Sequence, residues 1–224
     1  MDTDRRTARL AGALYLLTFA SSIPALLLLS PVLDDARYVL GPGADARVTA
    51  GLLLDLVNAA ACVGTAVVLH RLLRADAPAR ALGFVTSRVL EAAIIAVGVL
   101  SLLAVLTLRQ DVAAGAVPDE GAALVTAHAL VALRDWTFLL GPGLVSAVNA
   151  ALLGSVLLQH RRVPRAIPLL GVVGAPLQIV SVLLTALGHN SQLSALSAVA
   201  VLPIFAWELS LGVWLVARGL RRPA

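Results

Sequence analysis

Polar and charged side chains that could bind a ligand or carry a proton interrupt stretches of this chain that are otherwise apolar. The charged members are Asp55, Arg88, Glu91 and Glu208, and the uncharged polar members are Asn58, Asn149 and Gln178. An ionisable group inside a membrane-spanning segment is costly to bury, so it is a candidate functional group by default. Carboxylates beside a guanidinium and amides can bind a small polar solute or carry a proton across the apolar region.

The spacing of these residues indicates that they point toward one another. Asp55 and Asn58 are three residues apart, as are Arg88 and Glu91, so each pair shares one face of a helix. A rise of about 1.5 Å per residue and a hydrocarbon core of about 30 Å place Glu91 and Glu208 at one depth, near the middle of the bilayer. We expect Glu91 to pair with Arg88. Because three carboxylates would face one cation, we also expect Glu208, rather than Glu91, to hold a proton.

Two further charges, Arg134 and Asp135, are adjacent at the outer edge of the fourth apolar stretch and are expected to form a charge pair there. The single cysteine, Cys62, lies in the second stretch and excludes an intrachain disulfide and a cysteine-based metal site. No H-E-x-x-H spacing is present. We therefore expect no metal, no cofactor and no catalytic residues.

The elements that must position these residues are six apolar runs, each close to the roughly 20 residues that a spanning helix needs. Their expected bounds are 10–29, 50–72, 82–108, 135–158, 166–187 and 196–218. Hydrophobic residues make up 59% of the chain and charged residues 13%, whereas a soluble domain has about 25% charged residues. The sequence predicts an all-α integral membrane bundle of six transmembrane helices, forming a single transmembrane domain over residues 1–224.

The basic residues, all of them arginines, are sorted to one side of this bundle. Most fall in the two termini and in the second and fourth loops, at Arg5, Arg6, Arg9, Arg71, Arg74, Arg80, Arg161, Arg162, Arg165, Arg218, Arg221 and Arg222. Basic loops stay in the cytoplasm. The pattern predicts that both termini are cytoplasmic, with the lipid bilayer rather than nucleic acid as the partner of the positive charge.

Two local signals modify the fourth span. Pro118-Asp119-Glu120 is a good helix start, so we expect a short outer-side helix over 119–133, before the fourth span and lying on the outer face. Gly141-Pro142-Gly143 is the most pronounced break inside any span.

Several motifs together resemble a known family. They are Ala8-Arg9-Leu10-Ala11-Gly12 in the first span, Ser87-Arg88-Val89-Leu90-Glu91-Ala92 in the third, Arg134-Asp135-Trp136-Thr137-Phe138 at the start of the fourth and Leu202-Pro203-Ile204-Phe205-Ala206-Trp207-Glu208 in the sixth. The chain resembles the domain of unknown function 4386 family of bacterial multi-pass membrane proteins over nearly its full length. The resemblance implies a six-helix protein of the bacterial inner membrane and attaches no activity to it. Asp55 stands where we expect glutamate in that family.

Three functions fit these residues. The favoured one is small-solute or proton-linked binding or transport through the buried Asp/Arg/Glu cluster. The second is a non-catalytic accessory or structural subunit, as a homodimer or with a partner membrane protein, in which the charges only fix helix packing. The third and least favoured is an intramembrane enzyme acting on lipid. A cavity reached by water would favour the first, a closed dry cluster the second, and a groove open sideways to lipid the third.

Overall fold

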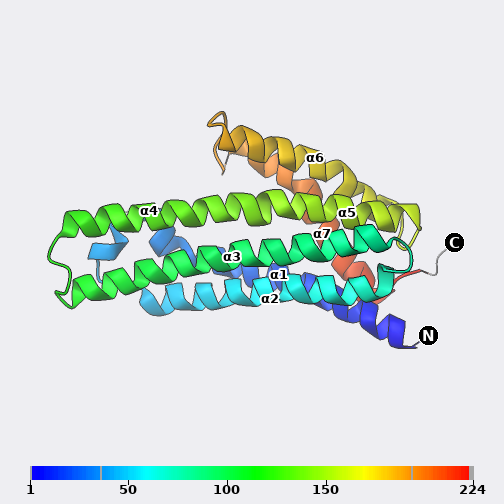
Figure 1. Cartoon of the computed structure of the whole chain (residues 1–224), viewed down its shortest axis with the longest axis horizontal. Helices are drawn as coiled ribbons and strands as arrows, with labels where there is room; N and C mark the ends of the chain where they lie inside the picture. The colour runs from blue at the N-terminus through cyan, green and yellow to red at the C-terminus, as the bar shows by residue number, and fades with distance from the viewer. Residues whose placement is uncertain (1, 36, 193, 222–224) are drawn as a thin grey trace.

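The computed structural model describes residues 2–35, 37–192 and 194–221, and these are almost entirely helical (Figure 1). Six helices are long and apolar enough to cross a membrane, which confirms the predicted all-α transmembrane bundle. The elements in chain order are α1 (Asp2–Asp34), η1 (Tyr38–Leu40), α2 (Asp45–Leu73), α3 (Pro78–Ala113), α4 (Glu120–Phe138), η2 (Leu139–Val145), α5 (Ser146–Gln159), α6 (Ala166–Ala186) and α7 (Ala195–Ala217).

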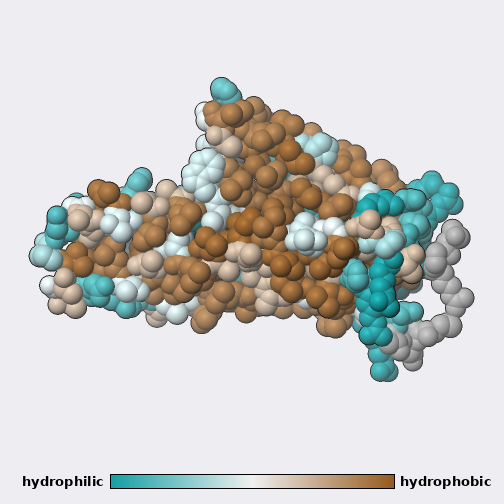
Figure 2. Space-filling model, in the orientation of Figure 1, coloured by the Kyte–Doolittle hydropathy of each residue, from teal (hydrophilic) through white to brown (hydrophobic). Residues whose placement is uncertain are grey.

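Both termini lie at one end of the bundle, which we call the terminal end; the opposite end is the far end (Figure 1). Hydrophobic residues cover the middle of the face in Figure 2, and hydrophilic residues gather at the two ends, most densely at the terminal end. Arg222 of the C-terminal arginine group lies outside the described residues. The molecule is a multi-pass membrane protein whose apolar surface requires a lipid bilayer around it.

The helix that begins at the predicted start, with Asp119 as its N-cap, does not end before the fourth span. It runs on through η2 and α5 as one element of 40 residues from Glu120 to Gln159. The expected separate helix on the outer face is therefore the far end of the fourth span itself. The physical reason is that no Gly or Pro occurs between Gly121 and Gly141 to end the helix.

Pro142 widens this long helix instead of breaking it. Leu139–Val145 form a π-helix around it. Proline has no backbone N–H and its ring clashes with the carbonyl four residues earlier, so a wider turn relieves both problems. The prolines inside α1, α6 and α7 are accommodated without such a change.

Two large apolar cores hold the bundle together, one toward each end, and a smaller buried cluster around Cys62 and Ile95 joins α2 and α3. The core at the terminal end joins α1, α2, α3, α5, α6 and α7 around Tyr15, Phe84 and Trp207. The far-end core joins the first four helices and η1, with Leu29, Val99 and Leu102 among its members. The α6–α7 hairpin packs on α5 and α1 near the terminal end and diverges from α4 toward the far end (Figure 1). This divergence creates the space in which the candidate site lies.

Candidate functional site

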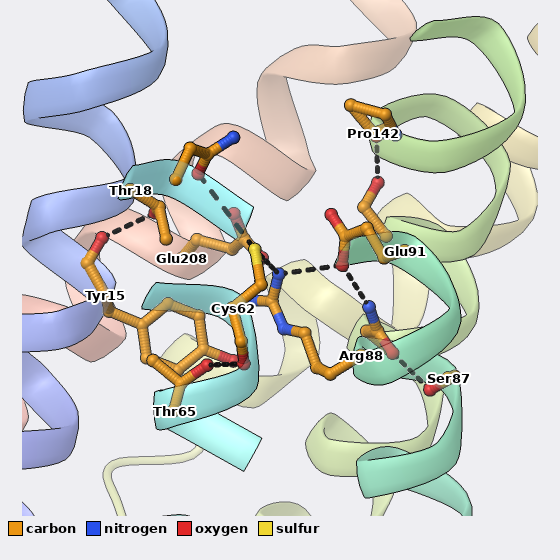
Figure 3. A network of polar contacts seen from close by, with 12 residues as sticks. Tyr15, Thr18, Cys62, Thr65, Ser87, Arg88, Glu91, Pro142 and Glu208 are labelled. Carbon is orange, nitrogen blue, oxygen red and sulfur yellow. Dashed lines mark hydrogen bonds and ion pairs between the residues drawn. The ribbon is translucent and has the colours of Figure 1, made fainter. Parts of the chain in front are cut away.

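Arg88 is the centre of the candidate site. Its Nη1 lies 2.9 Å from Glu91 Oε2, one helical turn further along α3, and its Nη2 lies 2.7 Å from Glu208 Oε1 on α7 (Figure 3). The structure thus contains the expected Arg88–Glu91 pair and adds Glu208 to the same guanidinium. One cation facing two carboxylates leaves one negative charge in excess unless one carboxyl group holds a proton.

Asn149 brings α5 into this arrangement. Its Nδ2 donates to Glu91 Oε2 at 2.6 Å, and its Oδ1 accepts from Ser87 Oγ. We call Arg88, Glu91, Asn149 and Glu208 the polar cluster. Because its members come from three helices, the cluster fixes the rotation of α3, α5 and α7 relative to one another.

Aromatic rings and a thiol enclose the guanidinium. The Arg88 Cζ atom lies 5.1 Å from the centroid of the Tyr15 ring and 5.9 Å from that of Phe84. Cys62 Sγ is 3.5 Å from Arg88 Nη1. Arg88 is only 2% exposed and Glu91 4%, so water does not screen their interaction and each depends on the other to remain charged.

A cavity of about 460 Å³ lies beside the polar cluster, in the space where the α6–α7 hairpin diverges. Arg88, Glu91 and Glu208 line one end of this cavity. The Glu208 side chain is 16% exposed, whereas the Glu91 side chain is only 5% exposed. Glu208 is therefore the carboxylate that an occupant of the cavity would meet. The volume falls in the range of pockets that hold small organic ligands, about 300–1,000 Å³.

Gln178 lines the same cavity from α6. Its Nε2 donates to the carbonyl oxygens of Gly143 at 2.7 Å and Pro142 at 3.3 Å, and to Ser146 Oγ at 3.1 Å. The π-helix thus explains why Gln178 is buried here: it exposes carbonyl groups that need donors. Gln178 Oε1 is buried and has no hydrogen-bond partner among the described residues.

Asp55 and Arg134 line the cavity closer to the far end. They interact electrostatically, but within the described part of the chain neither side chain makes an ion pair or a hydrogen bond. Arg134 is 7% exposed and stacks on Phe138, with 4.7 Å from its Cζ to the ring centroid. Asp135 is exposed and has no ion pair with Arg134 among those residues, because adjacent residues on a helix point about 100° apart.

The structure therefore arranges the residues singled out in the sequence in two groups. Five belong to or touch the polar cluster: Arg88, Glu91, Asn149, Glu208 and, through Cys62 Sγ at 4.0 Å, Asn58. Asp55 and Gln178 share the cavity without bonding to that cluster, and Arg134 joins them.

Sequence reasoning missed three contributors: Tyr15, Cys62 and Ser87. A signal existed for two of them. Cys62 is four residues after Asn58, and Ser87 is four residues before Glu91, so each continues a polar helix face. Tyr15 lies in an apolar span that carries no charge and offered no such signal.

The site offers hydrogen-bond donors, acceptors and charges of both signs around one cavity. It offers no set of three His, Cys, Asp or Glu side chains, within the residues the structure describes, that could hold a metal ion. Within the polar cluster, the Arg88 guanidinium partly neutralises the two carboxylates that it contacts.

Comparison with known proteins places the chain in one family. Residues 10–219 match the family described as Domain of unknown function (DUF4386), so the chain belongs to that family. No curated protein and no solved structure matches the chain.

Proposed function

We propose that this DUF4386 member binds a small polar solute in the cavity, with the polar cluster as the floor of the site and Glu208 as the carboxylate that the solute contacts. The observation that carries the proposal is the position of Glu208. It is bonded to a buried guanidinium at 2.7 Å, yet it faces a cavity large enough for a ligand. A network that only locks helices needs no such opening.

Cysteine accessibility provides a first test. Glu208 lines the cavity with 16% of its side chain exposed, whereas Cys62, the only thiol in the sequence, is 2% exposed. In a Cys62→Ser background, small methanethiosulfonates should modify Glu208→Cys in the protein reconstituted in vesicles, and a bulky maleimide should react far more slowly. Cys62→Ser alone is the negative control. No modification by either reagent under native conditions would mean a closed cluster and would favour the structural subunit.

The second test measures binding itself. Thermal unfolding of the purified protein is followed with amino acids, carboxylates, amines and polyols at millimolar concentration and several pH values. A solute at 100 times its Kd should stabilise the protein by about 2.7 kcal/mol. We expect that stabilisation to be lost in Glu208→Gln and to persist in Glu120→Gln, a change at the first residue of α4. Equal behaviour of the two variants would refute the role of Glu208.

A further inference from the structure

The cavity has an opening on its side as well as polar walls. The contact between α1 and α7 is close near the terminal end, where a Cβ atom built on Gly12 would lie 2.6 Å from Gly212 O. It continues to the edge-to-face pair of Phe19 and Phe205, whose ring centroids are 5.0 Å apart. Farther toward the far end, residues of both helices line the cavity instead.

The walls of this opening are apolar and exposed. Ile23 and Leu26 of α1 are 50% and 44% exposed, and Val201 and Phe205 of α7 are both 42% exposed. All four also line the cavity. Because these helices span the membrane, the opening faces hydrocarbon chains, and an acyl chain can leave the cavity there without contact with water.

The polar end of the same space holds two opposite charges that do not contact each other. Arg134 is buried and stacks on Phe138, and Asp55 is half-buried; the two act on each other electrostatically, but no ion pair or hydrogen bond of the described residues reaches either side chain. Burial of a charge that lacks a contacting counter-charge costs free energy. Gln178 Oε1, deeper in the cavity, is a buried acceptor that also lacks a donor. Two charges that face one cavity without touching each other are complementary to a molecule that carries both signs.

The depth of Asp55 in the membrane also fits a lipid head group. About 8 Å separates Asp55 from the far surface of the hydrocarbon core if that surface lies near the start of the apolar run of α2. A head group at this level with its chain passing Ile23 and Val201 has the orientation of a lipid in the far leaflet.

We propose that the cavity binds a zwitterionic amphiphile, with its anionic group on Arg134, its ammonium group on Asp55 and its chain leaving between α1 and α7. This assignment rests on the proposed function, because it requires that the cavity binds a ligand, and it names that ligand's polar part as the head group of a lipid. The head-group chemistry is shared with water-soluble zwitterions, and the apolar opening favours the lipid.

The test uses the full-length protein in detergent and measures bound lipid by native mass spectrometry. The probes are dioleoylphosphatidylethanolamine, which carries phosphate and ammonium, dioleoylphosphatidylglycerol, which lacks the ammonium, and free O-phosphoethanolamine, which lacks the chains. The expected result is a preference of about tenfold or more for the first lipid, equivalent to about 1.4 kcal/mol. If O-phosphoethanolamine bound as tightly as the lipid, the acyl chain would contribute nothing, and the proposal that the ligand is an amphiphile would be overturned.

Variants test each contact. Asp55→Asn should abolish the preference for the ethanolamine lipid, while Asp111→Asn, a loss of the same charge on an exposed position of α3, should retain it. Val201→Trp should fill the opening and weaken the binding of both lipids. Asp55→Asn is nearly isosteric, so the test does not depend on a variant that fails to fold. A preference that survives in Asp55→Asn would overturn the proposal.

The two proposals fail separately. Solute binding that depends on Glu208, without any lipid preference, would overturn only the proposal that the ligand is a zwitterionic amphiphile. Lipid binding that is sensitive to Asp55 but not to Glu208 would overturn only the role of Glu208.

Discussion

Loss of the Arg88 guanidinium is expected to be the most damaging single change in the polar cluster. In Arg88→Ala, Glu91 keeps its hydrogen bond from Asn149 at 2.6 Å but loses the cation that lies 2.9 Å away. Glu208 loses its bond to Nη2, and the rings of Tyr15 and Phe84 lose the group that lies over them.

The magnitude follows from the burial of these groups. Removing one partner of a buried ion pair costs about 3–5 kcal/mol. For a chain of this size, about 1 kcal/mol corresponds to a shift in Tm of about 2–4 °C, so Arg88→Ala should unfold about 6–20 °C below the wild type. Glu208→Gln keeps an acceptor for Arg88 and leaves the Arg88–Glu91 pair intact, and its side chain is 16% exposed. We expect this variant to lose no more than about 1 kcal/mol.

The assay is thermal unfolding in one detergent at one protein concentration, followed by intrinsic fluorescence and confirmed by gel filtration after heating. Arg88→Met combined with Glu91→Gln removes both charges of the buried pair. It should recover at least half of the loss, since replacing a buried pair by neutral groups is often tolerated. Equal stability of Arg88→Ala and Glu208→Gln would refute the reasoning, as would a double variant that is less stable than Arg88→Ala.

Three further predictions concern packing, the far-end loop and topology. Gly171→Ala should destabilise the protein by about 1–3 kcal/mol, because the added Cβ atom would lie 2.8 Å from the Trp207 ring. Gly83→Ala should not destabilise it, because the nearest neighbour of its Cβ atom would be Leu152 at 3.5 Å. Thermal unfolding of the two variants side by side tests this difference. Arg109→Gln should speed amide hydrogen exchange at Tyr38–Leu40, because it removes the 2.7 Å ion pair with Asp45 and the hydrogen bond to Pro42 O, and unchanged exchange would show that this loop is held by η1 packing alone. In a Cys62→Ser background, Asp119→Cys should react with a membrane-impermeant maleimide on intact cells and Arg165→Cys should not; the opposite pattern would overturn the orientation predicted from the arginines.

The six spans could be predicted from hydropathy because each run needs only length and apolar composition. Their ends could not, since a helix does not stop where its hydropathy falls. α3 continues through Arg109, Gln110 and Asp111 to Ala113, because these residues are compatible with a helix and Arg109 finds a partner in Asp45.

The contacts of the site were predictable only within one helix. Arg88 and Glu91 were expected as a pair because their spacing of three residues brings them together on any helix. That Arg134 turns into the cavity with Asp55, away from Asp135, depends on how α2 and α4 are rotated in the bundle, and no spacing within either segment contains that information.

The seven-residue π-helix changes the directions in which side chains before and after it point. Arg134 precedes it and Ser146 follows it, and both line the cavity. Their separation is roughly three and a third turns of a regular α-helix, which would point the two side chains about 120° apart. The wider turns around Pro142 contain more residues per turn than an α-helix. They therefore rotate one half of the 40-residue helix relative to the other, so that both side chains face the cavity. Removing that rotation would turn Arg134 or Ser146 out of the cavity while every hydrophobic span kept its length.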